Sequence, residues 1–431
     1  MRKDDTFRVK GIPLDWDADQ LQSASNEQDG AALPTVKSLA LETHGRSLSA
    51  TVNFESLPNS MKALNRERSW NIHLPNNSAP LSLDDNFYGM TTIFAPPAEH
   101  HKVEYVERDN VDSSVDTSSV VAISGLGGHA FGSFKKRGGN FMWLRDALPF
   151  DLGDETTNGP MARVLIYGYN SKVANSHSIQ NLEDLATAFH AGLRQVVDNQ
   201  KRPIILIAHS LGGLVVKQVL ITLSQSQDVK DQQIFQSTYG MAFCGVPRHG
   251  MNIQSLILIA KDGHNRFLIE SLNNMQPQIL RRQHQDFLKA LSSESKSEIV
   301  CFYETLMSPT TEQDINGEWE MTGPEALLVT RESATTCRPW EAGPEYACAI
   351  NRSHSELVKF NHHDADYENV CERLRGLAHR AVAASKGRPE LRTSILPRFF
   401  ESHINVNNLL VEKTCLPAFK ILSSAITLLR R

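Results

Sequence analysis

From Ser119 onward, short uninterrupted apolar runs alternate with segments of a different periodicity. The runs SVVAISG, ARVLIYGY and PIILIAHS are typical of strands that are buried on both faces. Between the second and third runs, apolar residues recur every three or four positions, at Leu182, Leu185, Phe189, Leu193 and Val196. That spacing predicts a helix over residues 178–197. The alternation of buried strands with helices predicts a mostly parallel sheet covered by helices on both faces.

The same pattern continues toward the C-terminus. LGGLVVKQVLITL predicts a helix, and TYGMAFCGVP, SEIVCFYET and EALLVTRES predict three further strands. Residues 365–385 again have helical character.

The first 95 residues follow another order. Strands are expected at Phe7–Pro13, Val36–Leu41, Ser47–Glu55 and Asn71–Leu74, and helices at Asp17–Ser23 and Pro58–Leu64. This β-α-β-β-α-β order is the ferredoxin-like pattern. The expected domains are an α+β unit (1–95), a polar linker (96–118), an α/β unit (119–386) and a C-terminal tail with helical tendency (387–431).

Composition narrows the class of protein. The 431 residues are 40% hydrophobic and 22% charged, with a formal net charge of −5, so no overall basic surface for nucleic acid is indicated. Six cysteines without CxxC spacing favour a reducing compartment and give no zinc pattern. We expect no secretory signal, because the N-terminus lacks an apolar core segment, and no membrane span.

The strongest chemical motif is Ile207-Ala208-His209-Ser210-Leu211-Gly212-Gly213. It lies between an apolar strand and a helix and matches G-x-S-x-G, except that Ala208 occupies the first glycine position. Such a turn presents its serine above the sheet, and the N–H of Leu211 then faces a developing oxyanion. Ser210 is therefore the candidate nucleophile, against the alternative of a chance serine in a strand–turn–helix.

A glycine-rich loop, Ser124-Gly125-Leu126-Gly127-Gly128-His129, follows the first strand of the α/β unit. Glycines allow the backbone to approach a ligand, and we assign the second oxyanion donor to the N–H of Leu126. The alternative is a phosphate-binding loop. Against it, the segment lacks the P-loop Lys-Ser/Thr, and Ala130 replaces the last glycine of G-x-G-x-x-G.

A serine nucleophile needs a base and a group that orients the base, in the chain order Ser, acid, His. Glu304 ends the second strand after Ser210, and His354 follows the last predicted strand. We therefore expect Ser210, His354 and Glu304 to act together, without a metal or cofactor. The alternatives left open for the base and the acid are His249, His362, His363, Glu332 and Asp314.

Six motifs follow one another along the chain: GLGGH, WLRD, RVLIYGY, AHSLGG, the FxGxP strand end and HSELVKF. Because these motifs occur in the same order there, the chain resembles serine esterases of the α/β-hydrolase superfamily, in particular those of the SERAC type and their fungal NACHT- and ankyrin-associated relatives. The resemblance covers residues 119–375. It implies an α/β-hydrolase fold, with Ser210, Glu304 and His354 in the roles given above. It also implies an ester or lipid substrate whose acyl group is transferred to water or to an alcohol. It also implies association with mitochondria and endoplasmic reticulum. The chain departs from the family at Ser124, usually His, at Ala208, and at Arg248-His249, where the order is reversed.

FRVKGIP and GRSLSATVNF resemble, more loosely, the two motifs of an RNA-recognition motif. RNA binding by that sheet depends on aromatic side chains, but Ala50 and Val52 stand at the second motif's stacking positions. We therefore expect an RRM-like module that contacts protein rather than nucleic acid.

Two functions from different classes remain: an active serine hydrolase, and a signalling or scaffold module that kept the fold. For the C-terminal tail, an interfacial helix in peripheral membrane contact competes with a helix docked on the protein.

Overall fold

The computed structural model describes residues 5–24, 34–55, 61, 68–72, 80–96, 118–153, 160–197, 202–260, 263–292, 296–313 and 319–385. The expected tail (387–431) lies outside these residues, and so do nearly all of the expected linker (96–118) and the helix expected at 58–64. Within the described part of the chain, no helix is both long and apolar enough to cross a membrane. The association with mitochondria and endoplasmic reticulum stays a prediction.

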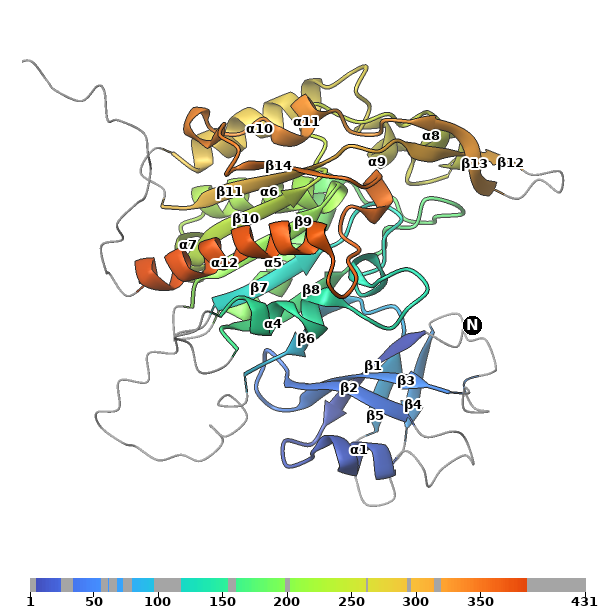
Figure 1. The fold of residues 1–431 in the computed structure, drawn as a ribbon, viewed down its shortest axis with the longest axis vertical. Coiled ribbons are helices and arrows are strands. Elements are labelled where there is room, and N and C mark those ends of the chain that lie inside the picture. The colour runs from blue at the N-terminus through green and yellow to red at the C-terminus, as the bar shows by residue number, and fades with distance from the viewer. Residues whose placement is uncertain are drawn as a thin grey trace, which may run out of the picture. The chain divides into compact units, whose positions relative to one another are not determined.

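A seven-stranded sheet, with strand order β14-β11-β10-β9-β7-β8-β6, is the main sheet of the described residues (Figure 1). Its strands are β6 (Gly89–Phe94), β7 (Ser118–Ile123), β8 (Ala162–Gly168), β9 (Ile204–His209), β10 (Thr238–Cys244), β11 (Glu298–Glu304) and β14 (Ala347–Ile350). All pairings are parallel except that of β6 with β8. This mostly parallel mixed sheet confirms the predicted α/β class, and its strand order is that of an α/β-hydrolase.

Side chains of β9 show why this sheet is covered on both faces. Leu206 and Ala208 belong to one apolar core, whereas Ile205 and Ile207 belong to the other. Successive residues of a strand point to opposite faces, so an uninterrupted apolar run fills two cores at once. The prediction that PIILIAHS forms a strand buried on both faces is thus confirmed.

The two cores are closed by helices. On one face lie α5 (Leu182–Val196), α6 (Leu211–Gln225) and α10 (Gln278–Ala290), and α12 (Ala365–Ser385) crosses the other together with α4 (Leu148–Asp151) (Figure 1). The shorter helices are η2 (Gly132–Phe134), α3 (Trp143–Asp146), α7 (Val229–Ser237), α8 (Gln254–Ala260), α9 (Arg266–Glu270), α11 (Arg331–Thr335), η3 (Pro339–Glu341) and η4 (His354–Glu356).

One predicted strand is wrong. EALLVTRES does not enter the main sheet: its first residues end β13 (Trp319–Ala326), which pairs only with β12 (Ser308–Gln313) in a two-stranded sheet, and its last residues begin α11. The strand that precedes His354 in the main sheet is β14, with the sequence ACAI. Four residues are too short a run for periodicity to distinguish from a loop.

The N-terminal unit contains a five-stranded antiparallel sheet with the order β2-β3-β1-β5-β4. Its elements are β1 (Thr6–Ile12), α1 (Ala18–Ala24), β2 (Pro34–Leu41), β3 (Leu48–Phe54), β4 (Ser69–Ile72) and β5 (Leu81–Asp84). The expected strands and first helix of this unit are present, and neither β5 nor β6 was foreseen. β6 follows directly and pairs with β8 of the main sheet. The change of sheet therefore falls before Gly89 rather than at residue 95, because the alternating pattern cannot reveal which sheet a strand joins.

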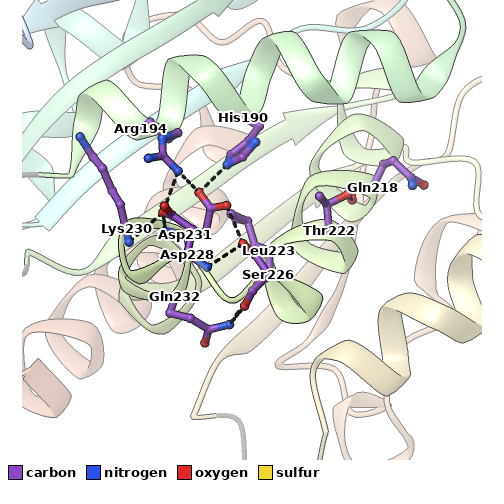
Figure 2. Close-up of polar contacts among 10 residues, drawn as sticks. All are labelled: His190, Arg194, Gln218, Thr222, Leu223, Ser226, Asp228, Lys230, Asp231 and Gln232. Carbon is purple, nitrogen blue, oxygen red and sulfur yellow. Dashed lines mark hydrogen bonds and ion pairs between the residues drawn. The ribbon is translucent and has the colours of Figure 1, made fainter.

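A polar network fastens α5 to α7 on the outside of the main sheet (Figure 2). Asp231 accepts hydrogen bonds from Ser226 Oγ at 2.8 Å and from Arg194, and lies 2.7 Å from His190 Nε2. Arg194 also contacts Asp228, which caps α7 through the N–H groups of Lys230 and Asp231. Burial opposes ionisation, but the hydrogen bonds from His190, Ser226 and Arg194 hold the pKa of Asp231 below its ordinary value.

Candidate active site

Ser210 occupies a strained turn between β9 and α6. Its backbone has φ 51° and ψ −124°, a left-handed conformation that residues other than glycine rarely adopt. The N–H of Ser210 donates to the carbonyl of Cys244 at 2.9 Å, which ties the turn to the end of β10. This is the geometry of a nucleophile elbow, in which the turn exposes the hydroxyl at the carboxyl edge of the sheet.

Two glycines permit the close packing around this turn. A Cβ on Gly212 would lie 2.6 Å from the carbonyl oxygen of Ser124, and a Cβ on Gly125 would lie 2.7 Å from Cβ of Ser210. Real Cβ atoms need at least 3.0 Å, so neither position accepts a larger residue without displacing backbone. The glycine-rich loop and the elbow are therefore in direct contact.

His354 joins Ser210 to an acid. Its Nε2 lies 2.9 Å from Ser210 Oγ, and its Nδ1 lies 2.6 Å from Glu304 Oε2. All three side chains are buried. The second oxygen of Glu304 accepts the N–H of Val329 at 3.0 Å, which fixes the rotation of the carboxylate. A hydroxyl, an imidazole and a carboxylate in this sequence can pass a proton from the serine to the histidine.

Two further groups, which the sequence analysis missed, hold the position of His354. The N–H of His354 donates to Ser308 Oγ at 3.1 Å, and its carbonyl lies 2.9 Å from His209 Nε2. Burial and the neighbouring His354 lower the pKa of His209 to about 3, so His209 is neutral and donates through Nε2. His209 lies inside the AHSLGG motif and could have been proposed from its place beside the nucleophile.

The glycine-rich loop is held by the segment after β8. Tyr169 donates its hydroxyl hydrogen to the carbonyl of Ser124 at 2.9 Å, and the N–H of Gly127 donates to the carbonyl of Ser171 at 2.6 Å. Among the described residues, the structure gives no hydrogen-bond acceptor to the N–H of Leu126 or of Leu211. One free donor thus lies in the glycine-rich loop, at Leu126, and the other at the start of α6, at Leu211.

The structure places the other candidates elsewhere. The ring of His362 packs on that of Phe141 at a centroid distance of 3.7 Å, and His249 faces His284. His363 is exposed and has a left-handed backbone, and Glu332 is exposed on α11. Asp314 lies outside the described residues. Of all the candidates, the structure brings Glu304 and His354 to Ser210.

Comparison with known proteins gives a limited set of relatives. No family model matches the chain. The protein SERAC1 of Bos taurus is 25% identical over 231 residues, covering 49% of this chain and 34% of that protein. SERAC1 of Danio rerio is 32% identical over 97 residues, covering 21% and 14%. The chain therefore spans about a third or less of the length of these relatives.

Solved structures give only distant matches. The mature lipase BlEst2 of Bacillus licheniformis is 16% identical with a TM-score of 0.36, covering 63% of this chain and 96% of the lipase. Lipase 1 of Pelosinus fermentans is 10% identical with a TM-score of 0.33, covering 60% and 98%. At such scores these likenesses carry no argument, and the fold assignment rests on the strand order described above. The similarity to SERAC1 proteins across about half of the chain confirms the predicted resemblance to serine esterases of the SERAC type.

Proposed function

We propose that this protein is a serine hydrolase of carboxylic esters, with Ser210 as nucleophile, His354 as general base and Glu304 as the acid that orients it. The observation that carries the proposal is the hydrogen-bonded chain from Glu304 through His354 to Ser210 Oγ, with distances of 2.6 and 2.9 Å, at a strained turn. A buried, oriented imidazole beside a strained serine is the arrangement that activates a hydroxyl for attack.

The chemistry follows from these contacts. Ser210 Oγ attacks the ester carbonyl while its proton moves to His354 Nε2, and the carboxylate of Glu304 stabilises the resulting imidazolium through Nδ1–H. The N–H groups of Leu126 and Leu211 bind the oxyanion of the tetrahedral intermediate. His354 then protonates the leaving alcohol. Water or a second alcohol, activated by the same base, releases the acyl group from Ser210.

An apolar acyl group suits the surroundings of the site. Leu306 and Met307, both exposed, lie in the short segment between Glu304 and Ser308, two residues that contact His354. Leu327 is also exposed and precedes Val329, whose N–H binds Glu304. Solvent-facing apolar side chains in the segments that carry Glu304, Ser308 and Val329 favour an ester with a hydrocarbon chain over a short, polar one.

The N-terminal unit is, in this proposal, a ferredoxin-like module used for contact with protein. The neighbouring strands β2-β3-β1-β5 and the helix α1 after β1 support that fold. Ala50 and Val52 lie in its apolar core. On the opposite face of β3, Ser49 donates to the carbonyl of Thr92 and Thr51 accepts from Arg145, so that face is covered by polar contacts with the main domain.

The proposal is tested by ester hydrolysis. Purified full-length protein should hydrolyse p-nitrophenyl esters, faster with octanoate than with acetate, and Ser210→Ala and His354→Ala should reduce turnover to background while the circular dichroism spectrum is unchanged. Hydrolysis that survives in Ser210→Ala would refute the assignment of the nucleophile.

The acyl preference is tested with a matched pair of surface variants. Met307→Ser should lower the octanoate-to-acetate ratio, because it removes exposed apolar surface next to Ser308, which binds the N–H of His354. Val229→Ser removes another exposed apolar side chain, at the start of α7. This position follows α6, which begins at Leu211, next to Ser210, and runs away from the site for 15 residues, about 22 Å. The control should leave the ratio unchanged, and equal effects of both variants would contradict the proposed acyl surface.

A further inference from the structure

A second group of reactive side chains lies apart from the serine. It consists of Lys217 on α6, Arg248 after β10, His284 on α10, Cys301 on β11 and Cys337 after α11. Lys217, Arg248 and Cys301 are almost completely buried. None of these five groups takes part in the proposed ester chemistry.

The buried positive charge of Arg248 needs a partner. A guanidinium stays charged in proteins, and a buried charge is stable only when it is paired. Nη1 of Arg248 donates to the carbonyl of Ala334, and Nη2 donates to Cys301 Sγ at 3.0 Å. Among the described residues, no carboxylate lies within ion-pair distance of Arg248. The sulfur of Cys301 is therefore the atom that can carry the neutralising negative charge.

Lys217 does not change the pairing of the Arg248 charge with the sulfur of Cys301. Burial lowers the pKa of Lys217 well below its ordinary value, with a smaller effect from Arg248 in the same direction. Its Nζ lies 3.3 Å from Nδ1 of His284, and burial lowers the pKa of His284 too. Burial therefore disfavours the charged form of both groups, and Arg248 is the cation that faces the thiolate of Cys301.

Cys337 lies against that thiolate. The two sulfur atoms are 3.0 Å apart, within about 1 Å of the length of a disulfide bond. Although burial opposes ionisation, the hydrogen bond from Cys337 and the charge of Arg248 lower the pKa of Cys301 to about 6. The same hydrogen bond and burial raise the pKa of Cys337. Near neutral pH the pair therefore shares one proton. Cys337 is half-buried and Cys301 is fully buried, so Cys337 is the cysteine nearer to solvent.

We propose that Cys301 and Cys337 are a thiol–disulfide site that hydrogen peroxide oxidises, with Arg248 as the residue that positions and stabilises the thiolate. When the shared proton lies on Cys301, the sulfur of Cys337 attacks one peroxide oxygen, the O–O bond breaks and hydroxide leaves, giving a sulfenic acid. Cys301 then loses its proton, attacks Cys337 Sγ and displaces a second hydroxide. In sum, two thiols and one peroxide give one disulfide and two waters, and the sulfurs lose the two electrons that the peroxide gains.

The experiment uses the full-length protein and reads out chemistry, not hydrolysis, so it is independent of the proposed function. Protein is exposed to hydrogen peroxide at pH 5 to 9, alkylated, and mapped by peptide mass spectrometry without reduction. We expect a crosslink between the peptides that contain Cys301 and Cys337, forming faster as pH rises through about 6, because the thiolate is present above that pKa and lost below it. Cys348→Ser, which removes another half-buried thiol, should leave the rate unchanged.

Two variants make the inference falsifiable. Arg248→Met should slow crosslinking at pH 7 by about tenfold, since the loss of thiolate outweighs the higher reactivity of a more basic thiol. Cys301→Ser should leave Cys337 as a sulfenic acid that dimedone traps, which tests the order of steps even if Arg248→Met does not fold. The proposal would be overturned by random crosslinks among the six cysteines, by peroxide oxidation without a crosslink, or by a rate indifferent to Arg248.

Discussion

Replacing Gly125 by alanine tests whether the glycine-rich loop sets the position of the nucleophile. The added Cβ would lie 2.7 Å from Ser210 Cβ and 3.1 Å from His209 Nδ1. Carbon atoms in contact normally lie about 3.5–4.0 Å apart, so the loop or the serine must move by about 1 Å. Both alternatives disturb the site, because the loop carries one proposed oxyanion donor and the turn carries the other.

The expected size of the effect follows from that displacement. A misplacement of about 1 Å can cost on the order of 100-fold in rate, equivalent to about 2.7 kcal/mol in the barrier. Overpacking a filled site costs a further roughly 1–3 kcal/mol in the free energy of unfolding. We therefore expect Gly125→Ala to fold but to hydrolyse p-nitrophenyl esters about 100-fold more slowly, as kcat/KM per folded molecule.

The matched control is Gly240→Ala, in β10 of the same sheet. There the nearest atoms to an added Cβ are side-chain carbons of Ile205 at 3.3 and 3.4 Å, near the strand's beginning and far from Ser210. This variant should lose some stability in urea unfolding but keep its kcat/KM. The reasoning is refuted if Gly125→Ala retains full activity, or if both variants lose activity in proportion to their stability.

Three further predictions concern other contacts. Glu304→Gln should lower kcat about 10²–10⁴-fold, because an amide facing Nδ1 favours the wrong tautomer of His354, while Glu332→Gln should have no effect in the same assay. Asp231→Asn should lower the free energy of unfolding by about 1–3 kcal/mol at pH 7. Because the folded pKa of Asp231 is lowered, wild type and variant should converge in urea titrations as the pH falls below 3.8. Mixed single-stranded RNA at low salt should not bind the full-length protein in fluorescence anisotropy, since Ala50 and Val52 are buried; micromolar binding would contradict this.

Periodicity and motif spacing predicted the parts of the fold that have strong local signals. The doubly buried strand before Ser210 and the helix after it are visible in the sequence because both faces must be apolar. The short strand β14 and the fate of EALLVTRES were not predictable, because four residues carry too little periodicity. β6 has an ordinary strand pattern, and only the tertiary pairing with β8 reveals which sheet it joins.

The candidate site, like the fold, was predicted only in part from the sequence. The chain order of serine, acid and histidine, together with the strands counted after Ser210, favoured Glu304 and His354 over the alternatives that stayed open. The supporting contacts of His209 and Val329 were not predicted, because each joins residues that are distant in sequence or uses a backbone N–H. The backbone contact of Val329 has no residue-type signature, whereas His209 could have been proposed from its place beside the nucleophile.

Covalent labelling by a fluorophosphonate probe tests the central claim most directly, because the probe reacts with an activated serine and requires no knowledge of the substrate. Full-length protein should gain the mass of one adduct, on the peptide that contains Ser210, and His354→Ala should label far more slowly. Ser210→Ala should gain none while keeping the wild-type unfolding midpoint. An unlabelled wild type, or an adduct that persists in Ser210→Ala, would contradict the claim that Ser210 is an activated nucleophile.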